Sequence, residues 1–333
     1  MKRWGDTAIN VDVLKIDPEP VAGQIATLIR DQVFHQLRRR GVVVGLSGGV
    51  DSSVVAALCT RALGPGSVLG LLMPEKDSDP ESLRLGRLVA GRLGIEALVE
   101  DIAPLLEAAG CYRRRDDFIR LVFPEYGPGH KCKLVLPNVL EGAAYNLSWL
   151  VVESPEGEQQ RARPSPEAYL GIVAASNMKQ RARKQVEYYH ADRLNYAVAG
   201  TPNRLEYDQG FFVKNGDGAA DLKPIAHLYK SQVYQLAESL GVPQEVRLRI
   251  PTTDTYSLQQ TQEEFYFSMP YDKMDLCLFA INHSIPPAEA ARAAGLTPEQ
   301  VERVYRDIRS KRRATEYQHR QPLLAEPVPE VGS

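Results

Sequence analysis

A short loop rich in glycine and serine, Ser47–Ser53, combines backbone N–H groups, hydroxyls and one carboxylate in the order S-G-G-V-D-S-S. It lies between an apolar run, Val42–Leu46, and a run of helical character, Val54–Leu63. A turn from a buried strand into a helix gathers unpaired N–H groups and the positive end of the helix dipole, which favours an anion. Gly48 and Gly49 would allow the positive φ angles and close backbone approach that such a turn needs. The loop therefore predicts a phosphate site.

The acid of this loop, Asp51, would repel bound phosphates unless a cation lay between them. A magnesium ion that bridges the carboxylate and the phosphates removes this conflict. The hydroxyls of Ser47, Ser52 and Ser53 add donors. No lysine follows the glycines, so this is not a P-loop of the G-x-x-x-x-G-K-[ST] type, and an ordinary glycine and serine turn is the alternative.

The loop resembles the S-G-G-x-D-S loop of the N-type ATP pyrophosphatases, which bind ATP and transfer AMP to an oxygen of their substrate. A second block of residues narrows this resemblance to the NAD synthetases. It is similar to their pattern N-x-K-A-R-x-R, G-T-x-N-x-x-E, G-x-x-T-K-x-G-D-G and D-x-x-P at Asn177–Arg183, Gly200–Glu206, Gly210–Gly218 and Asp221–Ile225. With the amino-terminal half, the likeness covers most of the chain.

The resemblance implies an ATP-dependent, amide-forming ligase of the ammonia-dependent type. The carboxylate of deamido-NAD would attack the α-phosphorus of ATP, pyrophosphate would leave, and ammonia would displace AMP to give NAD. Positioning and charge stabilisation can carry this chemistry without a covalent enzyme intermediate. The same chemistry on a different carboxylate in a specialised pathway stays open, as does a binding-only protein that kept the fold.

The position of a second loop agrees with these roles. Gly200 and Thr201 close the apolar stretch Tyr196–Ala199 and so place the next loop at the carboxyl end of a strand, where ligands bind in open α/β sheets. Glu206 in that loop would join Asp51 around magnesium, although composition alone favours a solvent-facing glutamate.

The resemblance and the residue types together predict four sets of site residues. The expected catalytic residues are Asp51, Lys230 and Lys214. The expected ATP site comprises Ser47, Gly48, Gly49, Asp51, Ser52, Ser53, Thr201, Lys230 and Thr252. Substrate binding is assigned to Arg181, Lys214, Asp221 and Lys311, and the magnesium ligands to Asp51 and Glu206. Single surface lysines and Asx turns are common, and these are the alternatives for the basic residues and for Asp221.

The elements that must hold these residues alternate between strand and helix. Helical spacing or capping marks Pro20–Leu37 and Pro80–Leu93, and strand character marks Val42–Leu46, Val68–Met73 and Ala97–Val99. This alternation predicts an α/β fold with a doubly wound parallel sheet and helices on both faces, Rossmann-like as in the N-type ATP pyrophosphatases. Two short helices, Ala288–Ala294 and Pro298–Arg309, are expected near the carboxyl end.

One segment, at about 110–166, interrupts this alternation and is rich in proline and charge. We expect an excursion with a flexible hairpin or loop, longer than the connection that NAD synthetases usually have here. It leads into a long helix at about Tyr169–Leu194, so it would either cover the substrate site or form a surface or dimer contact. We expect one domain over residues 1–322 with this insertion, and a flexible tail over 323–333.

Composition is that of an ordinary enzyme: 333 residues, 25% charged, 44% hydrophobic, with a formal net charge of −2. Such a near-neutral chain does not indicate a nucleic-acid binder. Neither a long uninterrupted apolar run nor a signal peptide is visible, so we expect no membrane partner and a cytoplasmic location. The four cysteines form no C-x-x-C pair, which argues against disulfides and a zinc knuckle.

Partners follow from the resemblance and from what the sequence lacks. The expected small molecules are ATP as co-substrate, Mg²⁺, ammonia and deamido-NAD or another carboxylate. No amino-terminal nucleophilic cysteine and no glutaminase domain are visible, so ammonia would arrive free or from a separate glutaminase. Family members are usually homodimers, and the helix at about Tyr169–Leu194 is a candidate interface.

Overall fold

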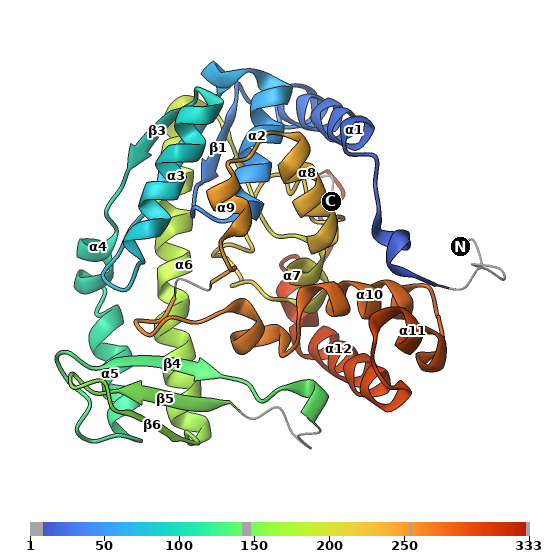
Figure 1. Ribbon diagram of the computed structural model, residues 1–333. Helices are drawn as coiled ribbons and strands as arrows, with labels where there is room; N and C mark the ends of the chain where they lie inside the picture. The colour runs from blue at the N-terminus through green and yellow to red at the C-terminus, as the bar shows by residue number, and fades with distance from the viewer. Residues whose placement is uncertain (1–8, 142–147, 253–254, 331–333) are drawn as a thin grey trace.

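The computed structural model describes residues 9–141, 148–252 and 255–330. A four-stranded sheet with the order β3-β2-β1-β7 forms the centre, and every neighbouring pair in it is parallel (Figure 1). Its strands are β1 (Val42–Gly45), β2 (Val68–Leu72), β3 (Glu96–Val99) and β7 (Ala197–Ala199). An isolated parallel bridge between Ala199 and Leu222 extends the edge next to β7.

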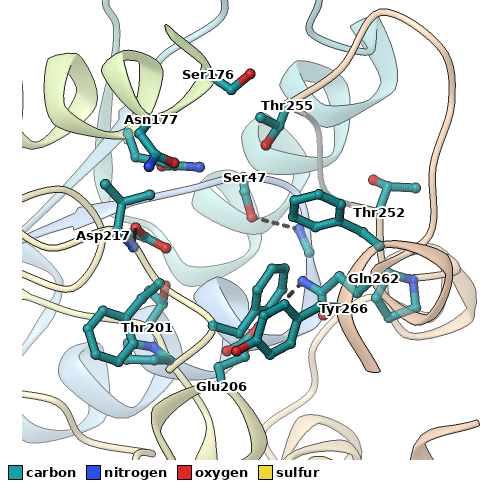
Figure 2. A pocket seen from close by; sticks show the side chains of 18 of the residues that line it. Ser47, Ser176, Asn177, Thr201, Glu206, Asp217, Thr252, Thr255, Gln262 and Tyr266 are labelled. Atoms are coloured by element: carbon teal, nitrogen blue, oxygen red, sulfur yellow. Dashed lines mark hydrogen bonds between the residues drawn. The ribbon is translucent and has the colours of Figure 1, made fainter. Parts of the chain in front are cut away.

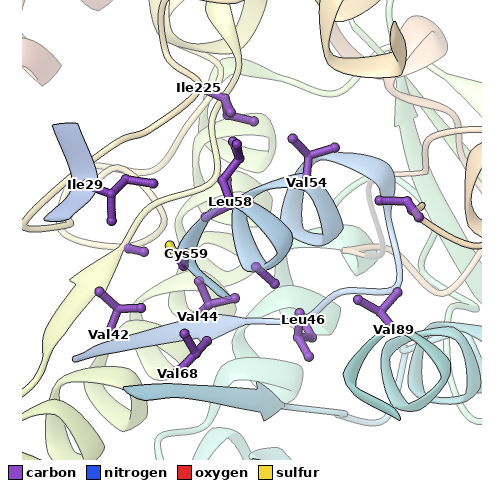
Figure 3. Packing of buried hydrophobic residues seen from close by; sticks show 14 of the residues in the cluster. Ile29, Val42, Val44, Leu46, Val54, Leu58, Cys59, Val68, Val89 and Ile225 are labelled. Atoms are coloured by element: carbon purple, nitrogen blue, oxygen red, sulfur yellow. The ribbon is translucent and has the colours of Figure 1, made fainter. Parts of the chain in front are cut away.

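Helices cover both faces of this sheet. On one face, α2 (Val50–Leu63) and α3 (Pro80–Leu93) pack on the strands, and α1 (Pro18–Asp31) and α8 (Lys230–Ser239) enlarge the same core (Figure 3). On the other face lies α6 (Pro166–Leu194). The doubly wound α/β fold predicted from the sequence is therefore confirmed.

Alternation along β1 explains how one strand serves two cores. Val42 and Val44 belong to the core under α2, whereas Val43 packs with Val198 and Ala191 on the side of α6. Successive side chains of a strand point to opposite faces, so a strand that is buried on both faces must be apolar throughout. Full burial of each valine contributes about 1.5–3 kcal/mol.

Local capping signals place the helix ends. Asp79 accepts a hydrogen bond from the backbone N–H of Glu81 (2.9 Å) at the start of α3, and Gly94 ends this helix with a φ of +66°. α1 starts at Pro18 and continues as a π-helical turn, Gln32–Gln36.

The inserted segment is more regular than a flexible hairpin or loop. It follows α4 (Ala103–Ala108) and contains α5 (Cys111–Arg120) and an antiparallel sheet with the order β4-β5-β6, shown at the lower left of Figure 1. The strands are β4 (Lys131–Val135), β5 (Trp149–Glu153) and β6 (Gln159–Ala162). They share a small core with α5 and α6, built around Ile119, Cys132, Leu150 and Ile172. The alternation Lys131-Cys132-Lys133-Leu134 is the period-two signal of a strand and could have predicted β4, whereas the exposed, polar β6 carries no such signal.

A group of helices closes the lower right of the molecule (Figure 1). It comprises α10 (Tyr271–Asn282), α11 (Pro287–Ala294) and α12 (Pro298–His319), with α7 (Arg204–Gln209) beside them, whereas α9 (Gln244–Leu248) packs next to α8 (Figure 1). The expected end of this last helix at Arg309 was wrong. The helix continues through the basic residues Lys311–Arg313 to His319, and Thr315 on its buried face packs against the rest of the protein. No helix in the described ranges has the length and apolar character needed to cross a membrane.

Candidate active site

A cavity of about 1120 Å³ opens at the carboxyl ends of β1 and β7 (Figure 2). The loop after β1 and the loop after β7 both line it, through Ser47 and Thr201 among others. The chain leaves β1 toward β2 on one side and leaves β7 toward the other side of the sheet. Ligands of open α/β sheets bind at such a switch point between two neighbouring strands. Residues of the insertion, of the segment after α9 and of α12 form the remaining wall.

The two glycines of the first loop have different roles. Gly48 has a φ of +72°, and a Cβ atom there would lie 2.6 Å from the carbonyl oxygen of Ser82. Gly49 is the N-cap of α2 with an ordinary φ of −93°. Of the two glycines that would allow a positive φ angle, only Gly48 adopts one. The Gly49 backbone lines the cavity at the start of the helix, whereas Gly48 does not line it.

The serine hydroxyls brace the loop from inside. Ser47 Oγ accepts a hydrogen bond from the Gly49 N–H (3.3 Å; Figure 2) and lies 3.2 Å from Ser52 Oγ. Ser53 donates to the carbonyl oxygen of Gly49 at 2.8 Å and does not line the cavity. Ser47, Gly49, Asp51 and Ser52 thus face the cavity, while Gly48 and Ser53 shape the turn behind them.

Asp51 and Lys230 form a buried ion pair in this cavity. The Lys230 ammonium is fully buried and contacts Asp51 Oδ2, while Asn203 Nδ2 donates to Asp51 Oδ1 at 3.1 Å. The first residue of α8 is Lys230, and its backbone N–H donates to Asp275 Oδ1 at 3.2 Å. Burial opposes the charge of Lys230, but Asp51 and Glu206 hold the pKa of its ammonium above the usual value.

Glu206 lies beside this pair on α7. Its Oε2 accepts a hydrogen bond from the backbone N–H of Asn203 (3.0 Å), and its Oε1 accepts one from Gln262 Nε2 (3.3 Å; Figure 2). Burial, and then the charge of Asp51, raise the pKa of Glu206 to about 8, and Lys230 offsets only part of this rise. The solvent-facing glutamate that composition favours is not what the structure has.

The two carboxylates have the chemistry of a magnesium site completed by substrate. Asp51 and Glu206 offer hard oxygen donors. The raised pKa of Glu206 indicates that the neighbouring positive charge does not balance the two carboxylates. In the described part of the chain, no group of three or more His, Cys, Asp and Glu side chains could hold a metal ion by itself. Mg²⁺ is commonly held by one or two carboxylates, with waters and phosphate oxygens supplying the rest, so this donor set fits it.

Asn203 and Gln262 are site residues that sequence reasoning missed. Asn203 caps α7, since its Oδ1 accepts from the Glu206 N–H at 3.3 Å, and its amide nitrogen is free to reach Asp51. An asparagine three residues before a glutamate is the signature of a capping box, and this signal could have found it. Gln262 carries no such local signal.

The predicted substrate residues do not all meet in the cavity. Lys311 lines it, donates to the carbonyl oxygen of Tyr266 (2.7 Å) and pairs with Asp307 (2.7 Å); burial lowers the pKa of its ammonium. Arg181, Lys214 and Asp221 lie outside the cavity lining in this chain.

These three residues instead make local contacts. Arg181 is exposed and donates to the carbonyl oxygen of Lys214 at 3.3 Å, and Lys214 donates to the carbonyl oxygen of Tyr317 at 2.8 Å. Asp221 accepts from the Val198 N–H at 2.7 Å and from the Tyr188 hydroxyl at 3.3 Å. Their roles with substrate, and the catalytic role of Lys214, stay predictions.

Other charged groups line the cavity without having been predicted. Lys184 and Glu187 form a buried pair on α6 (2.5 Å), and Arg163, just after β6, reaches the cavity rim. Thr252 faces the cavity as expected (Figure 2), whereas its neighbours Thr253 and Asp254 are outside the described residues. The insertion therefore contributes directly to the wall of the site.

Comparison with known proteins supports one family. The model of the NAD synthase family matches residues 21–118 and 157–322, on either side of much of the inserted sheet. The NH(3)-dependent NAD(+) synthetase of Rhizobium meliloti (strain 1021) is 64% identical over 322 residues, which cover 97% of this chain and 96% of that protein.

Solved structures agree on the fold. The NH3-dependent NAD synthetase from Campylobacter jejuni, in complex with the nitrate ion, superposes with a TM-score of 0.60 at 22% identity, covering 93% of this chain and 100% of that one. NMN synthetase from Francisella tularensis gives a TM-score of 0.60 at 21% identity, covering 93% and 99%.

Proposed function

The chain belongs to the NAD synthase family, and from this premise we propose that it adenylates the carboxylate of deamido-NAD with ATP and amidates it with ammonia, giving NAD, AMP and pyrophosphate. The observation that carries the proposal is the buried group of Asp51, Lys230 and Glu206 at the carboxyl ends of β1 and β7. This group provides a cation and two candidate magnesium ligands for a nucleoside triphosphate, and the reaction requires no nucleophile from the protein.

In the first step, the loop after β1 holds the pyrophosphate end of ATP. The N–H groups at the start of α2 and the hydroxyls of Ser47 and Ser52 face the cavity and would donate to phosphate oxygens. The Lys230 ammonium would neutralise charge that develops on pyrophosphate as the nicotinate carboxylate attacks the α-phosphorus. Thr201 and Thr252 would add donors from the neighbouring loops.

We propose that Asp51 and Glu206 hold Mg²⁺ when ATP is bound. The ion would supply positive charge to the phosphate oxygens and to the leaving pyrophosphate. Asn203 keeps both acids oriented through one hydrogen bond to each. Positive charge at this place would also return Glu206 to its ionised form at neutral pH, since its raised pKa comes from burial and from Asp51.

In the second step, ammonia attacks the acyl-adenylate and AMP leaves. The protein need only align the two reactants and exclude water, because the adenylate is already an activated acyl group. We propose that ammonia arrives free or from a separate glutaminase, and that the protein is a cytoplasmic homodimer. A change from ammonium to glutamine as nitrogen donor should stop turnover of the purified chain.

The decisive experiment follows both products in one tube. Purified chain is mixed with ATP, Mg²⁺, ammonium and deamido-NAD, and pyrophosphate release and NAD formation are measured together by mass. Equal amounts of NAD and pyrophosphate are expected. Pyrophosphate release with other carboxylates but none with deamido-NAD would contradict the proposed substrate, and ATP binding without any turnover would contradict the reaction class.

A further inference from the structure

A second cavity, of about 600 Å³, lies on the far side of α7 from Glu206. Residues three and four apart share one face of a helix, so Arg204, Tyr207 and Asp208 face this cavity while Glu206 faces the main one. The segment 223–227 and α12, which packs against α7 (Figure 1), complete its wall with Lys223, Ala226, His227, Arg312, Glu316 and His319.

The acids of this cavity are already engaged. Asp208 accepts two hydrogen bonds from the Arg312 guanidinium, at 2.6 and 2.8 Å, and Glu316 pairs with Arg320. Neither carboxylate is therefore available to balance further positive charge, and the charge of Arg312 is neutralised by Asp208.

Two other cations that line the cavity, Arg204 and Lys223, form no ion pair among the described residues, although the Asp217 carboxylate acts on Lys223 from further away. The Arg204 guanidinium lies over the ring of Tyr229 (5.1 Å), and its buried Nε has no hydrogen-bond partner. The Lys223 ammonium lies 4.9 Å from the ring of Tyr207 and 5.7 Å from that of Phe212. A buried N–H without a partner is uncommon in folded proteins, so the Arg204 side chain keeps donor capacity that the described residues do not use.

We propose that this cavity is a binding site for a small phosphate-bearing molecule. A guanidinium and an ammonium that come from separate segments and form no ion pair of their own match a phosphate group with two negative charges better than a single carboxylate. Tyr207 and His319 also line the cavity, with their rings edge to face at 4.9 Å, so an aromatic surface lies beside the two cations. The site is separate from the main cavity and does not depend on the reaction assigned to it.

Isothermal titration of the full chain tests this site without turnover. The main cavity is first filled with a non-hydrolysable ATP analogue and Mg²⁺, and inorganic phosphate, pyrophosphate and AMP are then titrated separately. One further equivalent of at least one probe should bind, and the strongest probe identifies the chemistry beyond the phosphate group. Absence of any second equivalent with all three probes would overturn the proposal.

Substitutions then locate the second equivalent. Arg204→Gln and Lys223→Gln should each weaken it about tenfold or more, as expected for a charge-assisted contact to phosphate. Arg204→Lys keeps the charge and should weaken it less, while Arg309→Gln, an exposed arginine on α12, should leave it unchanged. Thermal unfolding verifies that each variant is folded. Equal binding by Arg204→Gln, Lys223→Gln and the Arg309 control would place the ligand elsewhere and sink the proposal.

Discussion

Lys230 and Asp51 are 179 residues apart in the sequence, yet the fully buried ammonium of one contacts the carboxylate of the other. Around this pair, Asn203 connects Asp51 to Glu206, so one lysine, one amide and two acids form a single unit. Removing one partner of a buried ion pair leaves an uncompensated charge and is more costly than the pair is stabilising. Substitutions in this unit should therefore change both the stability of the fold and the activity of the site.

Asp51→Ala should abolish pyrophosphate release and also destabilise the fold, because Lys230 loses its counter-charge. We expect a loss of about 3 kcal/mol in the free energy of unfolding, the lower end for breaking a buried pair. Urea unfolding and a pyrophosphate assay on the same sample check both effects. In Asp51→Ala/Lys230→Met the stability should largely return while turnover stays absent; retained turnover in either variant would contradict the assignment.

Asn203 is expected to have two separable roles, a helix cap and a donor to Asp51. Asn203→Ala loses both, and should cost about 1 kcal/mol of stability from the cap alone. Asn203→Ser keeps an N-cap oxygen but is too short to replace the amide donor, so it should restore much of the stability and not the activity. Chemical unfolding and kcat for NAD formation distinguish the roles; equal recovery of both would show that capping alone matters.

Glu206 should make stability fall as pH rises in the absence of Mg²⁺. Its pKa is raised from 4.5 to about 8, so between these values the folded state binds a proton that the unfolded state has released. Protons held more tightly by the folded state mean that stability is lost with increasing pH across this window. Glu206→Gln should flatten the slope of unfolding free energy from pH 5 to 8. An unchanged slope in this variant would contradict the raised pKa.

Gly48 and Gly49 offer a matched pair of alanine substitutions in the phosphate loop. Gly48→Ala puts a Cβ 2.6 Å from a carbonyl oxygen at a φ of +72°, and the left-handed backbone alone costs about 1–2 kcal/mol. Gly49→Ala meets only the Ser47 hydroxyl at 3.3 Å with an ordinary φ, so its fold should be nearly intact. Chemical unfolding and ATP titration of both variants test this difference. Equal stability of the two variants would show that the loop adapts to a side chain at either position.

The insertion should contribute to substrate affinity through Arg163. This residue and Arg161 flank the ring of Trp149 at 4.9 and 5.2 Å, but only Arg163 lines the main cavity. Arg163→Ala should raise KM for deamido-NAD several-fold, since a cation near an anionic dinucleotide is lost, with KM for ATP little changed. Arg161→Ala is the control and should behave as wild type. Equal kinetics for both variants would show that Arg163 does not contribute to substrate binding.

Local patterns in the sequence were enough to predict several helices and strands and the first loop of the site. The Asp79 cap with Pro80, the stop at Gly94 and the strand-glycine-helix junction at Ser47–Ser53 are all signals between residues close in the chain. Caps, positive φ angles and the periods of helices and strands act over a few residues, so they can be recognised without knowing the fold. The order of these elements then indicated the parallel sheet.

Which charged residues lie close together could be read only from the folded chain. Lys230 and Lys214 look alike in the sequence, but one is buried against Asp51 and the other donates to backbone carbonyls near the chain end. Gln262 reaches Glu206 across 56 residues, and the small sheet of the insertion shares a core with α6 that no local pattern indicates. Burial and the approach of remote segments come from the packing of the whole chain, which short-range patterns do not encode.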